Sequence, residues 1–176
     1  MRLDECPDPG LYYLMYTRCS RASDVHKNLA RELGGVGLGG SVTEEADLRT
    51  LVDKTLDAYG RVDAVVNGTG HAPMGHDDVL DITDEEWHAG LDLIMLNVVR
   101  MARLVTPVML RQDEGGAMVN ISTSFAFEPS AIFPVSSSLR SALAGFTKLY
   151  AERYAAEGHP DEQPATGLHR DLLRGG

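Results

Sequence analysis

The chain is poor in cysteine, in basic residues and in long apolar runs. Its two cysteines, Cys6 and Cys19, have the spacing of neither a metal-binding pair nor a disulfide framework. Lysine and arginine number 16 against 26 aspartates and glutamates, and the resulting net charge of −10 argues against the clustered positive face that nucleic acid or an anionic membrane requires. No stretch approaches the roughly 20 apolar residues of a membrane span, and residues 1–10 lack the apolar run of a signal peptide. We therefore expect a cytoplasmic protein that binds neither nucleic acid nor membrane.

The chain does contain enough apolar residues, 43% of 176, for one domain with a real core. Apolar runs of strand length alternate with segments of helical spacing. Capping signals stand at Thr43 and, as a capping box, at Thr83–Glu86. The expected strands are residues 11–17, 36–38, 62–66 and 117–121, and the expected helices are residues 21–33, 43–56, 83–110 and 136–156. This alternation predicts an α/β fold, a Rossmann-like doubly wound parallel sheet.

Residues 61–70, R-V-D-A-V-V-N-G-T-G, are the most informative stretch. An apolar β run over 62–66 ends abruptly at Asn67-Gly68-Thr69-Gly70. A buried strand followed by a glycine-rich turn is how open α/β sheets present a nucleotide at their carboxyl edge. The alternative is a plain strand-to-loop turn with two glycines.

Four segments in order resemble the short-chain dehydrogenase/reductase family, over roughly residues 11–158. Residues 62–70 resemble its D-x-x-V-N-N-A-G, residues 83–110 its long interface helix, residues 116–122 its G-x-I-V-N-I-S-S, and residues 136–148 its Y-S-A-S-K-A-A-L-x-G-F-T-K. Within this family, the residue pattern is most similar to that of the 3-oxoacyl-acyl-carrier-protein reductases. The resemblance implies an oxidoreductase that passes a hydride between NAD(P)(H) and a small carbonyl or 3-oxoacyl substrate. It also implies a homo-oligomer formed through the two long helices.

The resemblance places the catalytic positions on substituted residues. Ser136 stands for the family's tyrosine, Arg140 for its lysine, Thr123 for its serine and Ile94 for its helix asparagine. A lysine can lower a tyrosine pKa of about 10 into a useful range, whereas a serine needs a base and an arginine cannot release its proton. Thr123 keeps a hydroxyl that can hold a carbonyl oxygen. The alternatives are that Ser136 belongs to a helix N-cap after Pro134 and that Arg140 is a solvated helix residue.

The cofactor positions show a similar gap. The family's T-G-x-x-x-G-x-G phosphate loop has no match in residues 1–11, and we interpret residues 34–40 as a helix stop followed by a tight strand. Arg18, just past the first strand, suits the 2′-phosphate of NADP, although exposed arginines opening a helix are ordinary. The resemblance assigns the cofactor contacts to Arg18, Val42, Asn67, Gly68 and Gly70. We interpret a group of polar residues after the glycine turn as solvated loop residues and expect no metal site; they are His71, His76, Asp77 and Asp78.

The family's first strand, which would lie between strands 11–17 and 62–66, is missing from this sequence, as are its C-terminal strands. Each buried backbone group left unpaired costs about 1–3 kcal/mol against a folding margin of about 5–15 kcal/mol. We therefore expect an incomplete sheet that is poorly stable alone. Residues 1–158 form a partial Rossmann-like oxidoreductase domain in this interpretation.

Residues 159–176 look like an irregular tail without strand character. Dropping one base after the Gly158 codon lets the back-translated codons read I-R-M-N-N-L-L-P-G-F-I, similar to the family's G-I-R-x-N-x-x-x-P-G. Our hypothesis is a single-base insertion near Gly158, which a source gene without an in-frame Pro-Gly pair one base away would refute. The rival to an active enzyme is a catalytically inactive remnant that acts only by helix pairing with an intact paralogue.

Overall fold

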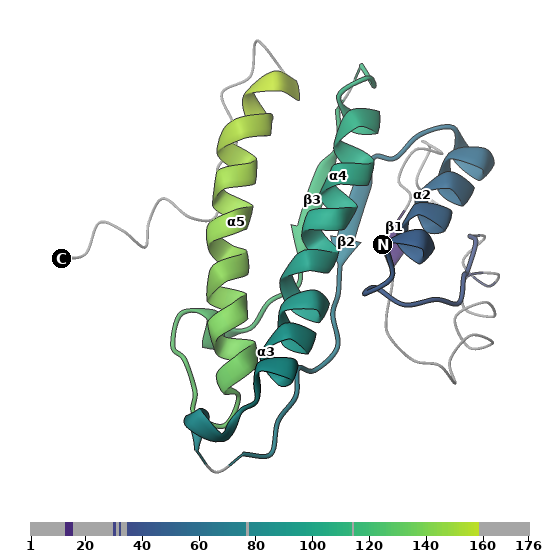
Figure 1. Cartoon of the computed structure of the whole chain (residues 1–176). Coiled ribbons are helices and arrows are strands. Elements are labelled where there is room, and N and C mark those ends of the chain that lie inside the picture. Colours follow the sequence, from purple (N-terminus) through teal and green to yellow (C-terminus); the bar gives the residue numbers. More distant parts are fainter. Residues whose placement is uncertain are drawn as a thin grey trace.

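The computed structural model describes residues 13–15, 30, 32, 35–76, 78–113 and 115–158, with 13–15 and 156–158 described by their backbone alone. Three strands form one parallel sheet in chain order: β1 (Tyr13–Met15), β2 (Ala64–Asn67) and β3 (Ala117–Asn120). β2 lies in the centre and pairs with β3 from Ala64 opposite Ala117 to Asn67 opposite Asn120. The expected α/β class with an incomplete parallel sheet is confirmed (Figure 1).

The expectation of unpaired edges between the first two strands is wrong. β1 pairs directly with β2, with Tyr13 opposite Ala64 and Met15 opposite Val66. Backbone N–H and C=O groups in a sheet are too costly to leave without partners, so the two edges pair with each other across the place that the missing strand of the family would occupy. The low stability inferred from orphaned groups at this edge therefore does not follow.

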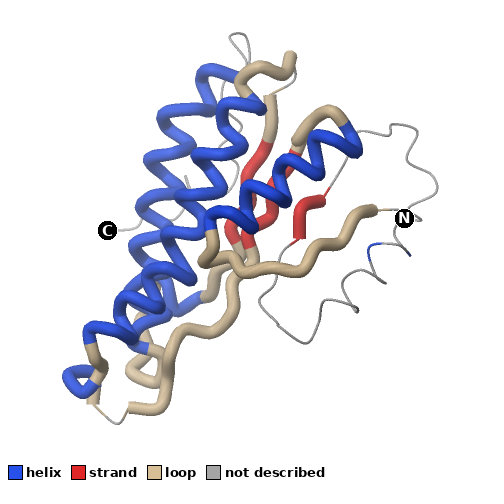
Figure 2. The backbone as a smooth tube through the Cα atoms, turned by 45° about the vertical axis from the view of Figure 1, so that its right-hand side comes forward, coloured by secondary structure: helices blue, strands red, loops and turns tan. Residues whose placement is uncertain are grey.

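The helices gather on one side of the strands, as Figures 1 and 2 show. They are α2 (Glu45–Tyr59), α3 (Asp84–Leu91), α4 (Asn97–Met109) and α5 (Pro134–Gly158), with a π-helical turn, η3 (Asp92–Leu96), between α3 and α4. The predicted helix 83–110 is confirmed as one continuous helical run, but its π-helical turn has no counterpart in the prediction. None of the helices in the described part of the chain is both apolar and long enough to span a membrane.

Two local predictions are wrong. Residues 36–38 form no strand and Val36 is 52% exposed, because the surrounding glycines offer little side-chain packing and favour irregular backbone. Thr43 does not cap α2: Glu44 occupies the N-cap position without a side-chain cap, and the Thr43 hydroxyl instead bonds the Ser41 hydroxyl at 2.7 Å. The predicted helix 21–33 falls outside the described residues, except that Ala30 and Glu32 are helical.

Two apolar clusters form the core between the sheet and the helices. The first joins α2, β2 and α4, and its most buried members are Leu48, Val62, Val65, Leu93 and Val105. The second joins α4 to the start of α5 and contains Ala72, Ile82, Ile94, Val98, Val135 and Leu143. Met118 on β3 touches both clusters, whereas Val119, its neighbour on the opposite sheet face, is 49% exposed.

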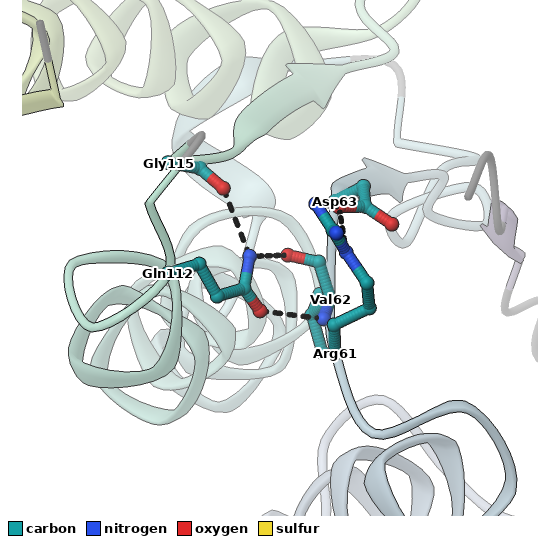
Figure 3. Close-up of polar contacts among 5 residues, drawn as sticks. All are labelled: Arg61, Val62, Asp63, Gln112 and Gly115. Atoms are coloured by element: carbon teal, nitrogen blue, oxygen red, sulfur yellow. Dashed lines mark hydrogen bonds and ion pairs between the residues drawn. The ribbon is translucent and has the colours of Figure 1, made fainter.

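Gln112 closes the end of the central strand where chain segments 50 residues apart meet (Figure 3). Its Oε1 accepts a hydrogen bond from the Val62 backbone N–H at 2.8 Å, and its Nε2 donates to the Val62 carbonyl at 2.9 Å. The same Nε2 donates to the Gly115 carbonyl at 2.9 Å. The side-chain amide thus imitates one rung of a strand and ties β2 to the turn before β3.

The predicted capping box at the start of α3 is confirmed. The Thr83 hydroxyl accepts from the Glu86 N–H, and Glu86 Oε2 accepts from the Thr83 N–H at 3.0 Å. Glu86 Oε1 also lies 2.8 Å from His76 Nε2. The hydrogen bond with His76, followed by that with the Thr83 backbone, holds the pKa of Glu86 below its ordinary value.

Replacing Glu86 by glutamine removes this charge and keeps the capping hydrogen bond, since glutamine also serves at this position of a capping box. A carboxylate with a lowered folded pKa stabilises the protein above its ordinary pKa, and the effect is lost as the pH falls through the folded value. We expect Glu86→Gln to melt slightly below wild type at neutral pH and the gap to close as the pH falls below 4.5, the ordinary value. Thermal melts at several pH values measure this gap. A gap that widens on acidification would contradict the assignment.

Candidate functional site

The carboxyl ends of β2 and β3 are tied to α5 by a chain of polar side chains. Asn67 Nδ2 donates to Asn120 Oδ1 at 2.8 Å, and Asn120 Nδ2 donates to the Thr147 hydroxyl at 2.9 Å. Thr147 in turn donates to the Leu143 carbonyl at 2.8 Å. This series of hydrogen bonds fixes the last residues of both strands, and therefore the loops that follow them, against the helix.

Arg140 joins the two loops at this edge. Its Nε donates to the Ser136 hydroxyl at 3.2 Å, one turn earlier on α5. Its NH1 donates to the Ile121 carbonyl at 2.9 Å, just past β3, and its NH2 donates to the Thr69 hydroxyl at 3.2 Å in the glycine turn after β2. Burial lowers the pKa of Arg140 from its ordinary value. The side chain is half-buried and held by three neutral oxygens, so it is not a freely solvated helix residue.

Ser136 lies in the first turn of α5, so the N-cap interpretation of this residue is wrong. The helix already begins at Pro134, whose fixed φ suits a first helical position. The neighbouring Ser137 is 1% exposed, and its hydroxyl accepts from the Ser130 N–H at 3.1 Å. The structure therefore brings Ser136 and Arg140 together, as the family alignment implies for this pair of positions.

Thr123 lies in the loop after β3 and has a local role. Its hydroxyl accepts from the Phe125 N–H at 3.4 Å and begins a short 3-10 helix, η4 (Ser124–Ala126). Ser141 on α5 donates to the Ala126 carbonyl at 2.5 Å, which anchors this loop to the same helix that carries Arg140. No hydrogen bond links Thr123 to Ser136 or Arg140 in the part of the chain described by the structure.

Ile94 has an apolar side chain, and it is fully buried in the second core cluster, within the π-helical turn. The sequence analysis missed a buried polar group nearby. Asn97 is 4% exposed, donates from Nδ2 to the Leu93 carbonyl at 2.7 Å, and leaves Oδ1 without a described partner. Its spacing of four before Met101 was the available signal, because it puts an amide on the buried helix face.

The structure describes four of the five predicted cofactor residues, and their surroundings differ. Arg18 falls outside the described residues. Val42 is 4% exposed in the first core cluster, so only its backbone could touch a nucleotide. Asn67 is engaged with Asn120, whereas a Cβ added at Gly70 would meet no atom within 4 Å. Gly70 therefore borders open space, next to Thr69, whose hydroxyl accepts a hydrogen bond from Arg140.

Two further features concern the surroundings of this edge. Among the described residues, no group of three histidine, cysteine or carboxylate side chains is placed to hold a metal ion, and His76 is paired with Glu86. A groove of about 200 Å³ between α4, β3 and α5 is lined by Phe146, Tyr150 and Tyr154. Its lining also includes Gly115 and Gly116 before β3 and Asn120 and Thr147 at the carboxyl end of β3, so the groove follows β3 along its length and reaches the Asn120–Thr147 hydrogen bond.

Comparison with known proteins shows which proteins this chain resembles. A family model described as enoyl-(acyl carrier protein) reductase matches residues 12–159. The 2-dehydro-3-deoxy-D-gluconate 5-dehydrogenase of Dickeya dadantii is 28% identical over 105 residues, which are 60% of this chain and 41% of that protein. A Mycobacterium tuberculosis protein, (5R,7aS)-5-hydroxy-7a-methyl-1-oxo-2,3,5,6,7,7a-hexahydro-1H-indene-carboxyl-CoA reductase, is 35% identical over 97 residues, or 52% of this chain and 36% of its own length.

A solved structure shares the fold. The L-sorbose reductase of Gluconobacter frateurii, crystallised with NADPH and L-sorbose, superposes with a TM-score of 0.70 at 21% identity, covering 81% of this chain and 54% of that one. The chain thus spans less than half the length of the curated relatives named above and about half of this structure.

Proposed function

Because this chain belongs to the short-chain dehydrogenase/reductase family, we propose that it is an oxidoreductase that reduces a carbonyl group, in a 3-oxoacyl or similar small substrate, with NADP(H) or NAD(H). The observation that carries the proposal is the Arg140 network at the carboxyl edge of the parallel sheet. Ligands of open α/β sheets bind at this edge. The relatives that match the sequence are themselves named as dehydrogenases and reductases.

The residues at this edge fit one end of the cofactor better than the other. The guanidinium of Arg140 and the hydroxyls of Thr69 and Ser136 are suitable partners for ribose hydroxyls, and the open space at Gly70 leaves room beside them. The glycine-rich loop that would cradle the pyrophosphate has no match in the sequence. We therefore expect a nucleotide to bind by its nicotinamide end.

The proposed roles of the residues are positional. A bound nicotinamide nucleotide would supply the hydride. Arg140 would orient a hydroxyl or carbonyl oxygen, and Thr123 would hold the carbonyl oxygen with its hydroxyl. Ser136 and Arg140 do not release protons near neutral pH, so the proton would come from water and turnover would be slow.

Fluorescence titration of the purified full chain with NADPH, and separately with NADH, tests the proposal. We expect enhancement or quenching that saturates at micromolar nucleotide, and weaker binding for Arg140→Gln because its donor network is lost. Arg49→Gln, an exposed charge change on α2, is the matched control and should bind as wild type does. Absence of binding at millimolar nucleotide would refute the enzyme proposal.

That negative result would favour the alternative function, a catalytically inactive remnant that pairs with an intact paralogue. The substitution of all four aligned catalytic positions, Ile94, Thr123, Ser136 and Arg140, is the observation in its favour. Pairing would use the helical surfaces of residues 83–110 and 136–156. The same surfaces would make the homo-oligomer in the enzyme proposal.

A further inference from the structure

Exposed large apolar side chains are concentrated on two connecting segments, residues 68–83 and 122–133. The exposed large apolar residues in the described part of the chain number ten, and five of them belong to these segments, namely Met74, Val79, Leu80, Phe127 and Ile132. The other five are scattered over the segment 35–44, the end of α4, β3 with the residue after it, and α5. Single exposed apolar residues are ordinary, whereas a concentration of them is typical of a binding surface.

The two segments lie at the same end of the sheet. They follow the carboxyl ends of β2 and β3, and Figure 1 shows both in its lower part, at the starts of α3 and α5. Ala72 and Ile82 of the first segment share a core cluster with Val135, which lies just after the second. Leu80 and Ile132 lie close in sequence to these buried residues but are themselves 87% and 73% exposed. The five exposed side chains therefore form an apolar rim above a common buried base.

The rim continues from the residues that the proposed function uses. Arg140 donates to the Thr69 hydroxyl at 3.2 Å, near the start of the first segment. Thr123, which would hold the carbonyl oxygen, stands at the start of the second segment and begins η4. The rim residues come later on the same two segments, so a substrate held by its carbonyl group at Thr123 can extend its remaining part over them.

The charges of the two segments select the chemistry of that remaining part. Neither segment contains a lysine or an arginine, and together they carry four acidic residues, Asp77, Asp78, Asp81 and Glu128. An anionic group placed over these segments would meet like charges. An uncharged apolar group would instead gain the free energy of removing its own surface and that of the rim from water.

We propose that the apolar rim binds an uncharged alkyl or alicyclic part of the substrate, attached to the carbonyl group that is reduced. This inference rests on the proposed function for the word substrate and makes that substrate apolar and uncharged at its distal end. Leu80 and Ile132, the most exposed members of the rim, then act as specificity-determining residues.

Binding of uncharged ketones to the full chain, followed by saturation-transfer NMR without nucleotide and again with NADPH, tests the rim. The probes are 2-butanone, 2-hexanone and 2-octanone, together with 7-oxooctanoate, which matches 2-octanone in chain length but ends in a carboxylate. We expect the affinity to rise about fourfold with each methylene that the rim buries. The carboxylate should bind about tenfold more weakly than 2-octanone, because its charge must lose water without gaining a partner.

Leu80→Gln and Ile132→Gln keep the size of the side chain and remove its apolar surface. Each should weaken 2-octanone about tenfold and change 2-butanone much less, because the shorter ketone reaches less of the rim. Leu149→Gln makes the same change at an exposed leucine on α5 and should bind every ketone as wild type does. All three side chains are exposed, so the variants should fold.

The possible results separate the rim from the enzyme proposal. Equal affinity for all ketone lengths, equal affinity for 2-octanone and 7-oxooctanoate, or unchanged binding in both rim variants would overturn the rim, even if NADPH binds. Length-dependent ketone binding without NADPH binding would refute the enzyme and leave an apolar ligand site. A wild-type dimer that Leu80→Gln dissociates in analytical ultracentrifugation, with no ketone bound, would show that a second copy covers the rim and would also overturn the inference.

Discussion

Gly90→Ala is expected to lower the free energy of unfolding by about 1–3 kcal/mol, as overpacking in a dense core typically does. Gly90 is a buried residue of α3 where this helix meets the start of α5. A Cβ added there would collide with Val135 Cγ1 and lie 3.0 Å from Leu139 Cδ1. Val135 is fully buried, and its β-branched side chain has little freedom to rotate away. Thermal or urea unfolding measures the change, with about 2–4 °C of melting temperature per kcal/mol.

The matched control is Gly145→Ala in α5, where an added Cβ would meet nothing within 4 Å. In open space the same substitution should stabilise the helix by about 0.5–1 kcal/mol, because alanine has the higher helix propensity. The two changes therefore have opposite expected signs. Combining Gly90→Ala with Val135→Ala should remove part of the collision and cost less than the sum of the single changes. If Gly90→Ala stabilises as Gly145→Ala does, the close packing of α3 against α5 is wrong.

Gln112→Ala is expected to cost about 2–4 kcal/mol, because three hydrogen bonds disappear and the Val62 backbone loses both of its side-chain partners. Val62 is 2% exposed, so water replaces the lost amide poorly. The effect should appear as a lower denaturant midpoint with an unchanged slope, since the folded state loses contacts without changing the surface that unfolding exposes.

Two comparisons sharpen this test. Gln112→Glu keeps an acceptor for the Val62 N–H but faces the Val62 and Gly115 carbonyls with a second oxygen (Figure 3), so it should also destabilise. Arg111→Ala, an exposed neighbour, should stay within about 0.5 kcal/mol of wild type. Wild-type stability in Gln112→Ala would show that the imitation of a strand rung contributes little.

The elements with strong periodicity were predicted well. The three parallel strands and the helices around 43–59, 84–109 and 134–158 follow from apolar spacing, from the capping box at Thr83 and from Pro134. Weak local signals failed: the glycine-rich 36–38 segment forms no strand, and Thr43 bonds Ser41 where a helix cap was expected. In the first case the glycines favour irregular backbone, and in the second a hydroxyl contact replaces the expected cap.

The candidate site was predicted only in part. Ser136 and Arg140 lie four apart on one helix, so their contact follows from helical geometry alone. The hydrogen bond from Arg140 to Thr69 joins residues 71 positions apart. The bond from Arg140 to Ile121 ends on a backbone carbonyl, and every residue type has such a group. Asn97, whose Oδ1 has no hydrogen-bond partner among the described residues, was missed because the apolar spacing of its helix predicts the buried face but not that a polar residue lies on it.

The sequence by itself determined the family, the parallel α/β class and the order of the elements, because periodicity, caps and glycine turns are local properties of the chain. Only the tertiary structure decided that β1 pairs directly with β2 and that Arg140 meets neutral oxygens, with no acidic partner among the described residues. Strand neighbours and the compensation of a buried charge depend on which distant segments pack together. That packing is set by the burial of the whole core, and no single stretch of sequence contains it.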